Sequence, residues 1–331
     1  MHKDVVCAGF VALDVIYDAL NADVPKKVAA GGSACNVAMI TQFLGLSVSM
    51  VGEVGADRAG DIVRDELARC GVDTNGLEAN ESFDTPVVVE RLLEPAGGEP
   101  RHRFELRCPH CGSYFSRFRP SPIPKLEDLT CGLKAKTFVF DRATPAIVKL
   151  AERLKDEGAF ILFEPSSSAS GKPFRRAAGL CDALKYSADR LTSVSALASP
   201  ECVIIETKGS AGLRLSYTFR SRRIYKDFPA KYAGPPVDVT GAGDWLTAGM
   251  LVALKGNAKP NSQALSSAVR FGQSLAAMST LFLGARGMMD ALTRRQVLRA
   301  CDRVLDGQVP SIKPRTASPN SANPFASCYA G

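Results

Sequence analysis

Short apolar runs alternate with amphipathic stretches along most of the chain, and this alternation predicts an α/β protein. The apolar runs are continuous and rich in β-branched residues, which favours buried strands of a parallel sheet. These predicted strands are Asp4–Val11, Lys26–Ala30, Ser47–Val54, Lys136–Phe140, Ala159–Phe163, Ala183–Tyr186, Cys202–Thr207 and Leu213–Phe219. Strands that alternate with helices along the chain are typical of doubly wound folds.

Apolar residues at helical spacing predict the helices between these strands. Two predicted helices follow glycine-containing turns, one after Gly31-Gly32 and one after Gly241-Ala242-Gly243. In the second, Leu246, Met250 and Leu254 share one apolar face. Further helices are predicted at Asp61–Cys70, Ala146–Glu157 and Ser262–Phe282.

One region interrupts the alternation. Thr85–Leu93 and Arg101–Leu106 are extended and flank a turn at Pro95–Pro100, which predicts a β-hairpin that serves as a flap or lid. From Gln308 the chain is rich in Pro, Ser, Asn and Ala. We therefore expect one domain over residues 1–307 and a disordered tail over 308–331.

Composition narrows the function classes. The chain has 331 residues, 46% of them apolar, which suffices for a large α/β core. Its net charge of +7 is spread out, without a basic tract and interleaved aromatics, so we expect no nucleic-acid partner. Ten scattered cysteines and an N-terminus without a signal-peptide pattern predict a cytoplasmic protein. No apolar run reaches membrane-spanning length, so we expect no membrane partner.

The stretch from Asp238 to Trp245 carries the strongest chemical signal. The first turn of a helix presents free N–H groups and the positive end of the helix dipole. Gly241 and Gly243 lack side chains, so an anion can approach those N–H groups, and Asp244 stands beside that place. This arrangement suits a base that deprotonates a hydroxyl during phosphoryl transfer. The competing interpretation is an aspartate that only stabilises the helix dipole.

Two further polar residues lie where ligands bind in α/β sheets. Asp14 follows the first strand, and its carboxylate can accept hydrogen bonds from sugar hydroxyls or cap a turn. Asn36 lies in the first turn of the helix after Gly32 and can donate and accept. Cys35 occupies the second glycine position of a serine-hydrolase elbow, so that class is not supported.

A P-loop is also not supported. The run over residues 166–173 lacks the first glycine of that motif, and Pro173 replaces its last Ser/Thr.

The sequence also contains half of a zinc-binding pattern, Cys108-Pro109-His110-Cys111. A closed structural zinc site needs four ligands, and the sequence has no second C-x-x-C. His102, Cys131 or a second subunit would have to complete the site. We find no other plausible zinc position in the sequence, and we favour a metal-free turn at the base of the hairpin over a bound ion.

Several motifs agree in order and spacing, and through them the sequence resembles the PfkB, or ribokinase-like, carbohydrate kinases. The motifs are Gly31–Asn36 with Leu44-Gly45, Val51-Gly52, Gly55, Asp57 and Gly60, then Thr207–Gly212, and then Asp238–Asp244. The resemblance covers about residues 4 to 305.

The resemblance implies a fold and a reaction. The fold is a three-layer α/β sandwich around a mostly parallel central sheet, with a small β lid at about residues 15–30 and 85–107. The reaction is transfer of the γ-phosphoryl group of ATP, with Mg²⁺, to a hydroxyl of a sugar or nucleoside. We also consider that such a chain forms a homodimer through the lid.

The resemblance also assigns roles position by position. Asp244 is the general base, and Gly241, Ala242 and Gly243 form the anion hole. Asp14, Gly32, Asn36 and Asp141 bind the acceptor, whereas Thr207, Lys208, Gly209 and Gly212 form the nucleotide loop. Asp238 and Thr240 lie where family members often bind a monovalent cation such as K⁺.

One departure from the family motivates an alternative. The family often has Asn-x-x-Glu where this chain has Ser187-Ala188-Asp189-Arg190, so a glutamate of the magnesium and phosphate network is missing. The alternative is a catalytically weak member that acts as a sugar- or nucleotide-responsive binding protein. The intact Asp244 argues against it, because a binding protein needs no base. The dinucleotide-binding motif G-x-G-x-x-G would need a glycine where this chain has Leu246, so a dinucleotide-dependent enzyme is not supported.

Overall fold

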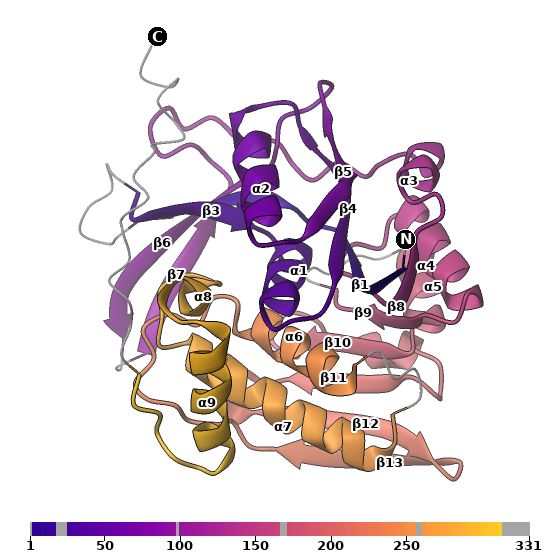
Figure 1. Cartoon of the computed structure of the whole chain (residues 1–331), viewed down its shortest axis with the longest axis vertical. Helices are drawn as coiled ribbons and strands as arrows, with labels where there is room; N and C mark the ends of the chain where they lie inside the picture. The colour runs from indigo at the N-terminus through magenta and orange to yellow at the C-terminus, as the bar shows by residue number, and fades with distance from the viewer. Residues whose placement is uncertain (1, 18–24, 97–98, 166–170, 256–259, 313–331) are drawn as a thin grey trace.

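The computed structural model describes residues 2–17, 25–96, 99–165, 171–255 and 260–312. Most of the predicted tail, residues 313–331, therefore lies outside the described residues, as do 18–24 of the predicted lid and 166–170 of the rejected P-loop. In the described parts, a large central sheet is covered by helices on both faces, and a smaller sheet stands at one end of it (Figure 1). None of the helices described is long and apolar enough to cross a membrane.

The central sheet has nine strands in the order β13-β12-β11-β10-β9-β8-β1-β4-β5. It is parallel from β5 to β11, and β12 and β13 add an antiparallel edge. The strands are β1 (His2–Ala8), β4 (Val48–Gly55), β5 (Asp73–Asn80), β8 (Lys134–Phe140), β9 (Phe160–Phe163), β10 (Ala183–Ser187), β11 (Val203–Thr207), β12 (Leu213–Phe219) and β13 (Arg222–Phe228).

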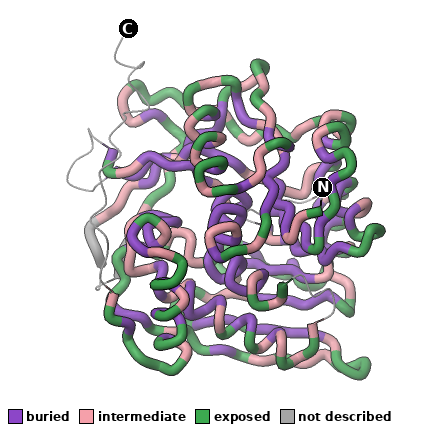
Figure 2. Tube along the Cα trace, viewed as in Figure 1, coloured by how far each residue is buried: buried purple, intermediate pink, exposed green. Residues whose placement is uncertain are grey.

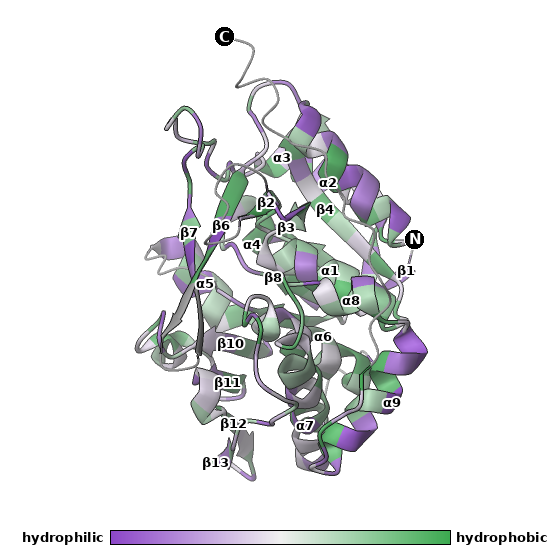
Figure 3. Ribbon diagram, turned by 90° about the vertical axis from the view of Figure 1, so that its left-hand side faces the viewer, coloured by the Kyte–Doolittle hydropathy of each residue, from purple (hydrophilic) through white to green (hydrophobic). Residues whose placement is uncertain are grey.

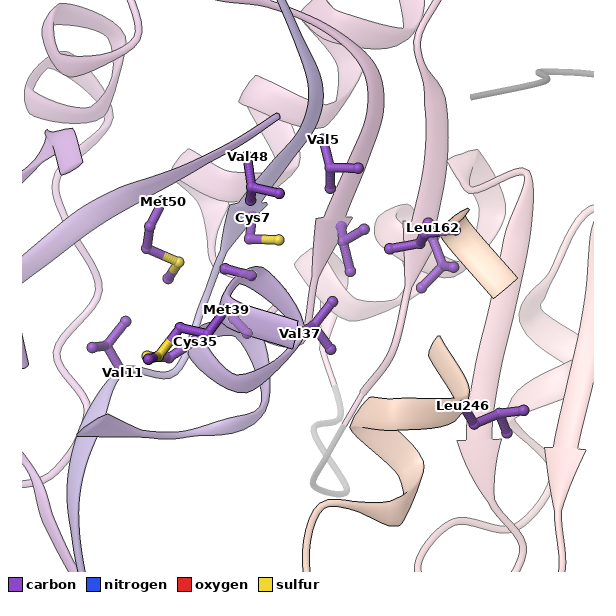
Figure 4. Packing of buried hydrophobic residues seen from close by; sticks show 14 of the residues in the cluster. Val5, Cys7, Val11, Cys35, Val37, Met39, Val48, Met50, Leu162 and Leu246 are labelled. Atoms are coloured by element: carbon purple, nitrogen blue, oxygen red, sulfur yellow. The ribbon is translucent and has the colours of Figure 1, made fainter. Parts of the chain in front are cut away.

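Alternate residues of the strands face opposite helix layers. Val5 and Cys7 of β1 pack in one cluster with helices α1, α6 and α7, as Figure 4 shows for part of that cluster. Val6 and Ala8 pack in another cluster with α3, α4 and α5. The helices are α1 (Ser33–Phe43), α2 (Arg58–Arg69), α3 (Ile123–Leu129), α4 (Pro145–Asp156), α5 (Lys172–Leu180), α6 (Ala242–Leu254), α7 (Ser262–Ser279), α8 (Gly287–Ala291) and α9 (Arg294–Leu305). The predicted three-layer α/β sandwich is confirmed.

Helix α6 lies at the centre of one helix layer. Leu246 and Met250 pack toward the sheet, whereas Trp245 and Ala248 pack in a third cluster with α7 and α9. The helix is therefore buried on more than the single apolar face that its sequence predicts. Figure 2 shows the sheet and the inner helices buried and the outer helix faces exposed, and Figure 3 shows the same contrast as alternating polar and apolar bands on α9.

The smaller sheet has the order β3-β2-β6-β7 and comes from the two segments predicted to form a lid. Its strands are β2 (Ala12–Tyr17), β3 (Lys27–Gly31), β6 (Val87–Ala96) and β7 (Glu99–Glu105). The pair β2–β6 is parallel and the other two pairs are antiparallel. Leu13, Val28 and Val89 join the same core cluster as β1, so the small sheet shares the core of the large one.

Three boundaries differ from the sequence-based predictions. Asp14 is not in a loop after the first strand but within β2, because the chain turns at Gly9 and enters a second strand at once. Helix α2 begins at Arg58 rather than Asp61, because the Asp57 side chain caps it by accepting from the Gly60 N–H, 2.7 Å away. Helix α6 begins at Ala242, so the glycine turn forms its first turn.

Candidate active site

The first turn of α6 begins at Gly241, a position where any side chain would be unfavourable. Gly241 has φ of 74°, and a Cβ there would lie 2.5 Å from the Cα of Ala285. The indole N–H of Trp245 donates to the carbonyl of the same Ala285 at 2.9 Å. These contacts tie the start of α6 to the segment before α8, so the N–H groups of Gly241, Ala242 and Gly243 keep a fixed position.

The first turns of α1 and α6 meet at a buried hydrogen bond. Asn36 Nδ2 donates to Asp244 Oδ2 at 2.9 Å, and these two residues are 5% and 8% exposed. The two glycine turns singled out in the sequence are thus brought together. Burial first, and the nearby carboxylate of Glu164 second, raise the pKa of Asp244 to about 8, against the opposing effect of Lys185. A carboxylate in such surroundings accepts a proton readily.

A buried arginine that sequence reasoning missed extends this pair. Arg286 donates through Nη1 to Asn36 Oδ1 and pairs through Nη2 with Glu66 Oε1 at 2.9 Å. Its side chain is 4% exposed; burial lowers its pKa, but Glu66 and the other acidic neighbours raise the pKa by more and keep the guanidinium charged. The sequence carried no signal for Arg286, because it lies in the irregular segment before the short helix α8.

Asp14 lies close to this arginine on the side of the small sheet. Its carboxyl group occupies the space beside Gly31, where a Cβ would lie 2.0 Å from the carboxyl carbon. Burial raises the pKa of Asp14 to about 7, whereas the charge of Arg286 opposes that rise. Gly32 has φ of 89°, and a Cβ there would collide with the Phe10 carbonyl. Asn36 thus contacts both Asp244 and Arg286, and the charge of Arg286 also acts on Asp14.

Asp141 is placed differently from the other predicted acceptor residues. It is 4% exposed and directly follows β8. Its Oδ1 accepts from the Phe10 N–H at 2.8 Å, and its Oδ2 pairs with Arg142 at 2.9 Å. The carboxylate therefore fixes the turn between β1 and β2, and its charge also acts on Asp244.

Two charged residues that the sequence analysis missed lie beside Gly243 of the predicted anion hole. Lys185 of β10 is 4% exposed and pairs with Glu164, which directly follows β9. The Thr247 hydroxyl donates to Glu164 Oε2 at 2.6 Å. The Lys185 ammonium lies 3.5 Å from the place of a Cβ on Gly243. Two features of the sequence could have identified these residues: Lys185 lies inside an apolar strand, and Glu164 lies at the carboxyl end of another strand.

The predicted nucleotide loop is a compact turn between β11 and β12. The Lys208 N–H donates to the Gly212 carbonyl at 2.8 Å, and Thr207 is the last residue of β11. Gly212 has φ of 97° and packs against the Phe228 carbonyl, whereas Gly209 is exposed. The carboxylate of Asp189 lies 4.0 Å from the place of a Cβ on Gly209. The altered Ser187–Arg190 stretch therefore still presents a carboxylate beside this loop.

The two predicted monovalent-cation residues hold the turn before α6. Asp238 is 1% exposed, and its carboxylate accepts from the N–H groups of Thr240 and Gly284 at 2.9 and 2.7 Å. The hydroxyl of Thr240 bonds to the carboxylate of Glu90 in the small sheet. Binding of a K⁺ ion by Asp238 and Thr240 stays a prediction.

The C-x-x-C pair lies just beyond β7. Cys108 is buried in the main core cluster and Cys111 is exposed. Within the part of the chain described, neither belongs to a group of three close His, Cys, Asp or Glu side chains. Such a group does exist elsewhere, at Glu90, His102 and Asp238, so the sequence analysis was wrong to consider the cysteines the only plausible zinc position.

Comparison with known proteins relates the N-terminal part of the chain to a family. The family model for pfkB family carbohydrate kinases matches residues 3–93. A fructokinase of Klebsiella pneumoniae is 28% identical over 297 residues, which cover 81% of this chain and 90% of that protein.

Two solved structures share the fold. Aminoimidazole riboside kinase from Salmonella enterica, complexed with aminoimidazole riboside and an ATP analog, superposes with a TM-score of 0.69 at 21% identity, over 91% of this chain and 99% of that one. Ribokinase from Giardia lamblia superposes with a TM-score of 0.72 at 17% identity over the same shares. These likenesses confirm the ribokinase-like fold.

Proposed function

We propose that this chain is a carbohydrate kinase of the pfkB family, and that it moves the γ-phosphoryl group of ATP to a hydroxyl of a sugar or nucleoside with Asp244 as general base. The observation that carries this proposal is the buried Asp244 carboxylate, held by Asn36 at the N-terminus of α6. A raised pKa suits a base that works near neutral pH.

The reaction follows from the groups around Asp244. The acceptor hydroxyl gives its proton to Asp244 as its oxygen bonds to the γ-phosphorus, and the bond to the bridging oxygen breaks to release ADP. The N–H groups of Gly241, Ala242 and Gly243 would stabilise the charge of the transferring group, that of Ala242 by leaving its 3.3 Å bond to the Val239 carbonyl. The Lys185 ammonium lies beside the same place and adds a positive charge.

Magnesium would neutralise the phosphate oxygens of ATP during transfer. Carboxylate oxygens are its usual protein ligands, and Glu164 and Asp189 place such oxygens near the anion hole and the nucleotide loop. The oxygen donors of these two carboxylates suit the ion by their chemistry, although the family's glutamate is missing. The loop at Thr207, Lys208, Gly209 and Gly212 would contact the nucleotide, and Asp238 with Thr240 would hold K⁺.

The acceptor would bind between the large sheet and the small sheet. Asp14 comes from the small sheet, Gly32 directly follows that sheet's strand β3, Asn36 bonds to Asp244, and Asp141 supports the turn between β1 and β2. We assign the small sheet, at about 15–30 and 85–107, as the lid over the acceptor and as the surface for a homodimer. A cytoplasmic location suits these small-molecule substrates.

The acceptor assignment has its own test. Asp14→Ala is expected to raise KM for the acceptor by about five- to a hundredfold, because an acceptor hydroxyl that is buried without its hydrogen-bond partner costs about 1–3 kcal/mol. KM for ATP should change little. An equal effect on both substrates would argue against the placement of Asp14.

Kinase activity itself is tested by ATP consumption with a panel of sugars and nucleosides. A kinase consumes ATP with at least one acceptor and releases one phosphorylated product per ADP. A catalytically weak binding protein would instead bind an acceptor or ATP without turnover. Binding without turnover across the whole panel would therefore favour the alternative function.

A further inference from the structure

A second cluster of ligating side chains lies away from Asp244, where the small sheet meets the turn before α6. We propose that Glu90, His102 and Asp238 form a binding site for a divalent transition-metal ion, zinc above all, that joins the small sheet to the central domain. This site shares Asp238, and the neighbouring Thr240, with the K⁺ position proposed above, and it is separate from Asp244 and from the C-x-x-C pair.

The geometry of the three side chains suits a single ion. His102 Nδ1 lies 3.9 Å from Glu90 Oε1 and 4.0 Å from Asp238 Oδ1, and the three ligand atoms all lie within 4.8 Å of one another. Ligands of a tetrahedral zinc ion at its usual bond lengths are about 3.4 Å apart. Movements of about 1 Å or less would therefore bring the three atoms onto one ion.

The sheet itself orients two of the ligands. Glu90 of β6 is paired with Phe104 of β7, and His102 is two residues from Phe104. Residues in this diagonal relation lie on the same face of an antiparallel pair. That face turns toward Asp238, which the N–H groups of Thr240 and Gly284 hold in place. The third ligand therefore comes from a different part of the fold.

The charges at this place call for a cation. Glu90 and Asp238 are 2% and 1% exposed, and a buried pair of carboxylates is costly without a compensating charge. Among the described ion pairs, His102 is the basic residue beside these two carboxylates. Its Nδ1 lies 3.9 Å from Glu90 Oε1 and 4.0 Å from Asp238 Oδ1.

The histidine decides the class of ion. Potassium and magnesium prefer oxygen ligands, whereas imidazole with carboxylates suits zinc and related transition metals. Three protein ligands leave a fourth position for water or for the nearby Thr240 hydroxyl. A bound ion would hold the small sheet against the turn that leads into the anion hole.

Binding of Co²⁺ and Zn²⁺ to the full chain, stripped of metal with a chelator, tests this site. The background is Cys108→Ser/Cys111→Ser, which removes the thiol alternative. We expect about one ion per chain and a Co²⁺ absorption spectrum that shows nitrogen and oxygen ligands without a thiolate band. In the same background, His102→Gln should weaken binding at least tenfold, and Glu90→Gln should do likewise, in line with the loss of a ligand.

His2→Gln is the matched control, because His2 lies at the exposed start of β1. It should bind the ion as the parent does, and the metal-free variants should give the parent's circular dichroism and unfolding midpoint. Binding that survives His102→Gln, or binding that disappears with the two cysteines, would overturn the proposal. A chain that binds neither ion when correctly folded would overturn it as well.

Discussion

At the scale of single residues, the surroundings of Asp244 predict how activity depends on pH. Its pKa is raised to about 8 by burial first and by Glu164 second, so the carboxyl group is largely protonated at pH 6. A general base acts only when deprotonated, so kcat/KM should rise with pH, by roughly fiftyfold between pH 6 and 8. The acid limb of the profile gives this pKa. A profile that is flat or falls over this range would contradict the assignment of Asp244 as the base.

The same raised pKa predicts a cost in stability. A carboxyl group whose pKa rises on folding binds more protons in the folded state, so the free energy of unfolding falls as pH rises through the interval between about 4 and 8. Asp244→Asn removes this titration. We therefore expect the variant to gain stability relative to wild type as pH rises from 5 to 8.5.

Urea unfolding at several pH values measures that difference. Asp65→Asn, at an exposed position on α2, is the control and should show no such trend. An Asp244→Asn variant whose relative stability stays constant or falls with rising pH would mean that Asp244 is not a strained, buried carboxylate.

At the scale of elements, the turn into α6 depends on the glycine at its start. Gly241→Ala would place a Cβ 2.5 Å from Ala285 in a left-handed conformation with φ of 74°. Gly158→Ala is a matched control, because Gly158 also has a positive φ, 93°, but nothing lies within 4 Å of its Cβ position. We expect Gly241→Ala to destabilise the protein by about 1–3 kcal/mol more than Gly158→Ala in urea unfolding. Equal losses would show that the packing against Ala285 is unimportant.

Elements with a strong local pattern were predictable from the sequence, and others were not. The apolar strand β8 and the glycine turns before α1 and α6 follow directly from residue types. The polar edge strand β5 has the sequence DTNGLEAN, which no local strand rule selects, because pairing with β4 alone makes it a strand. Asp14 was misplaced for a similar reason, since β2 gains its partners β3 and β6 only through distant pairing.

At the scale of the whole molecule, the site depends on contacts between segments far apart in the chain. Asn36 and Asp244 are 208 residues apart, and Arg286 and Asn36 are 250 apart. The sequence showed the two glycine turns separately, and the resemblance to a family suggested that they meet. The sequence could not place Arg286 or Lys185 at the site. It also could not predict the cluster at Glu90, His102 and Asp238. The contacts of all these residues depend on how the two sheets pack against each other.

The central claim is that Asp244 is the base of a phosphoryl-transfer reaction. The most direct measurement compares the turnover of wild type and Asp244→Asn, with the acceptor that the panel identifies, alongside their ATP binding. The amide keeps the shape and cannot take the proton, so kcat should fall by about a hundredfold or more while the Kd for ATP stays within a few-fold. An Asp244→Asn variant that turns over within a few-fold of wild type would contradict the claim.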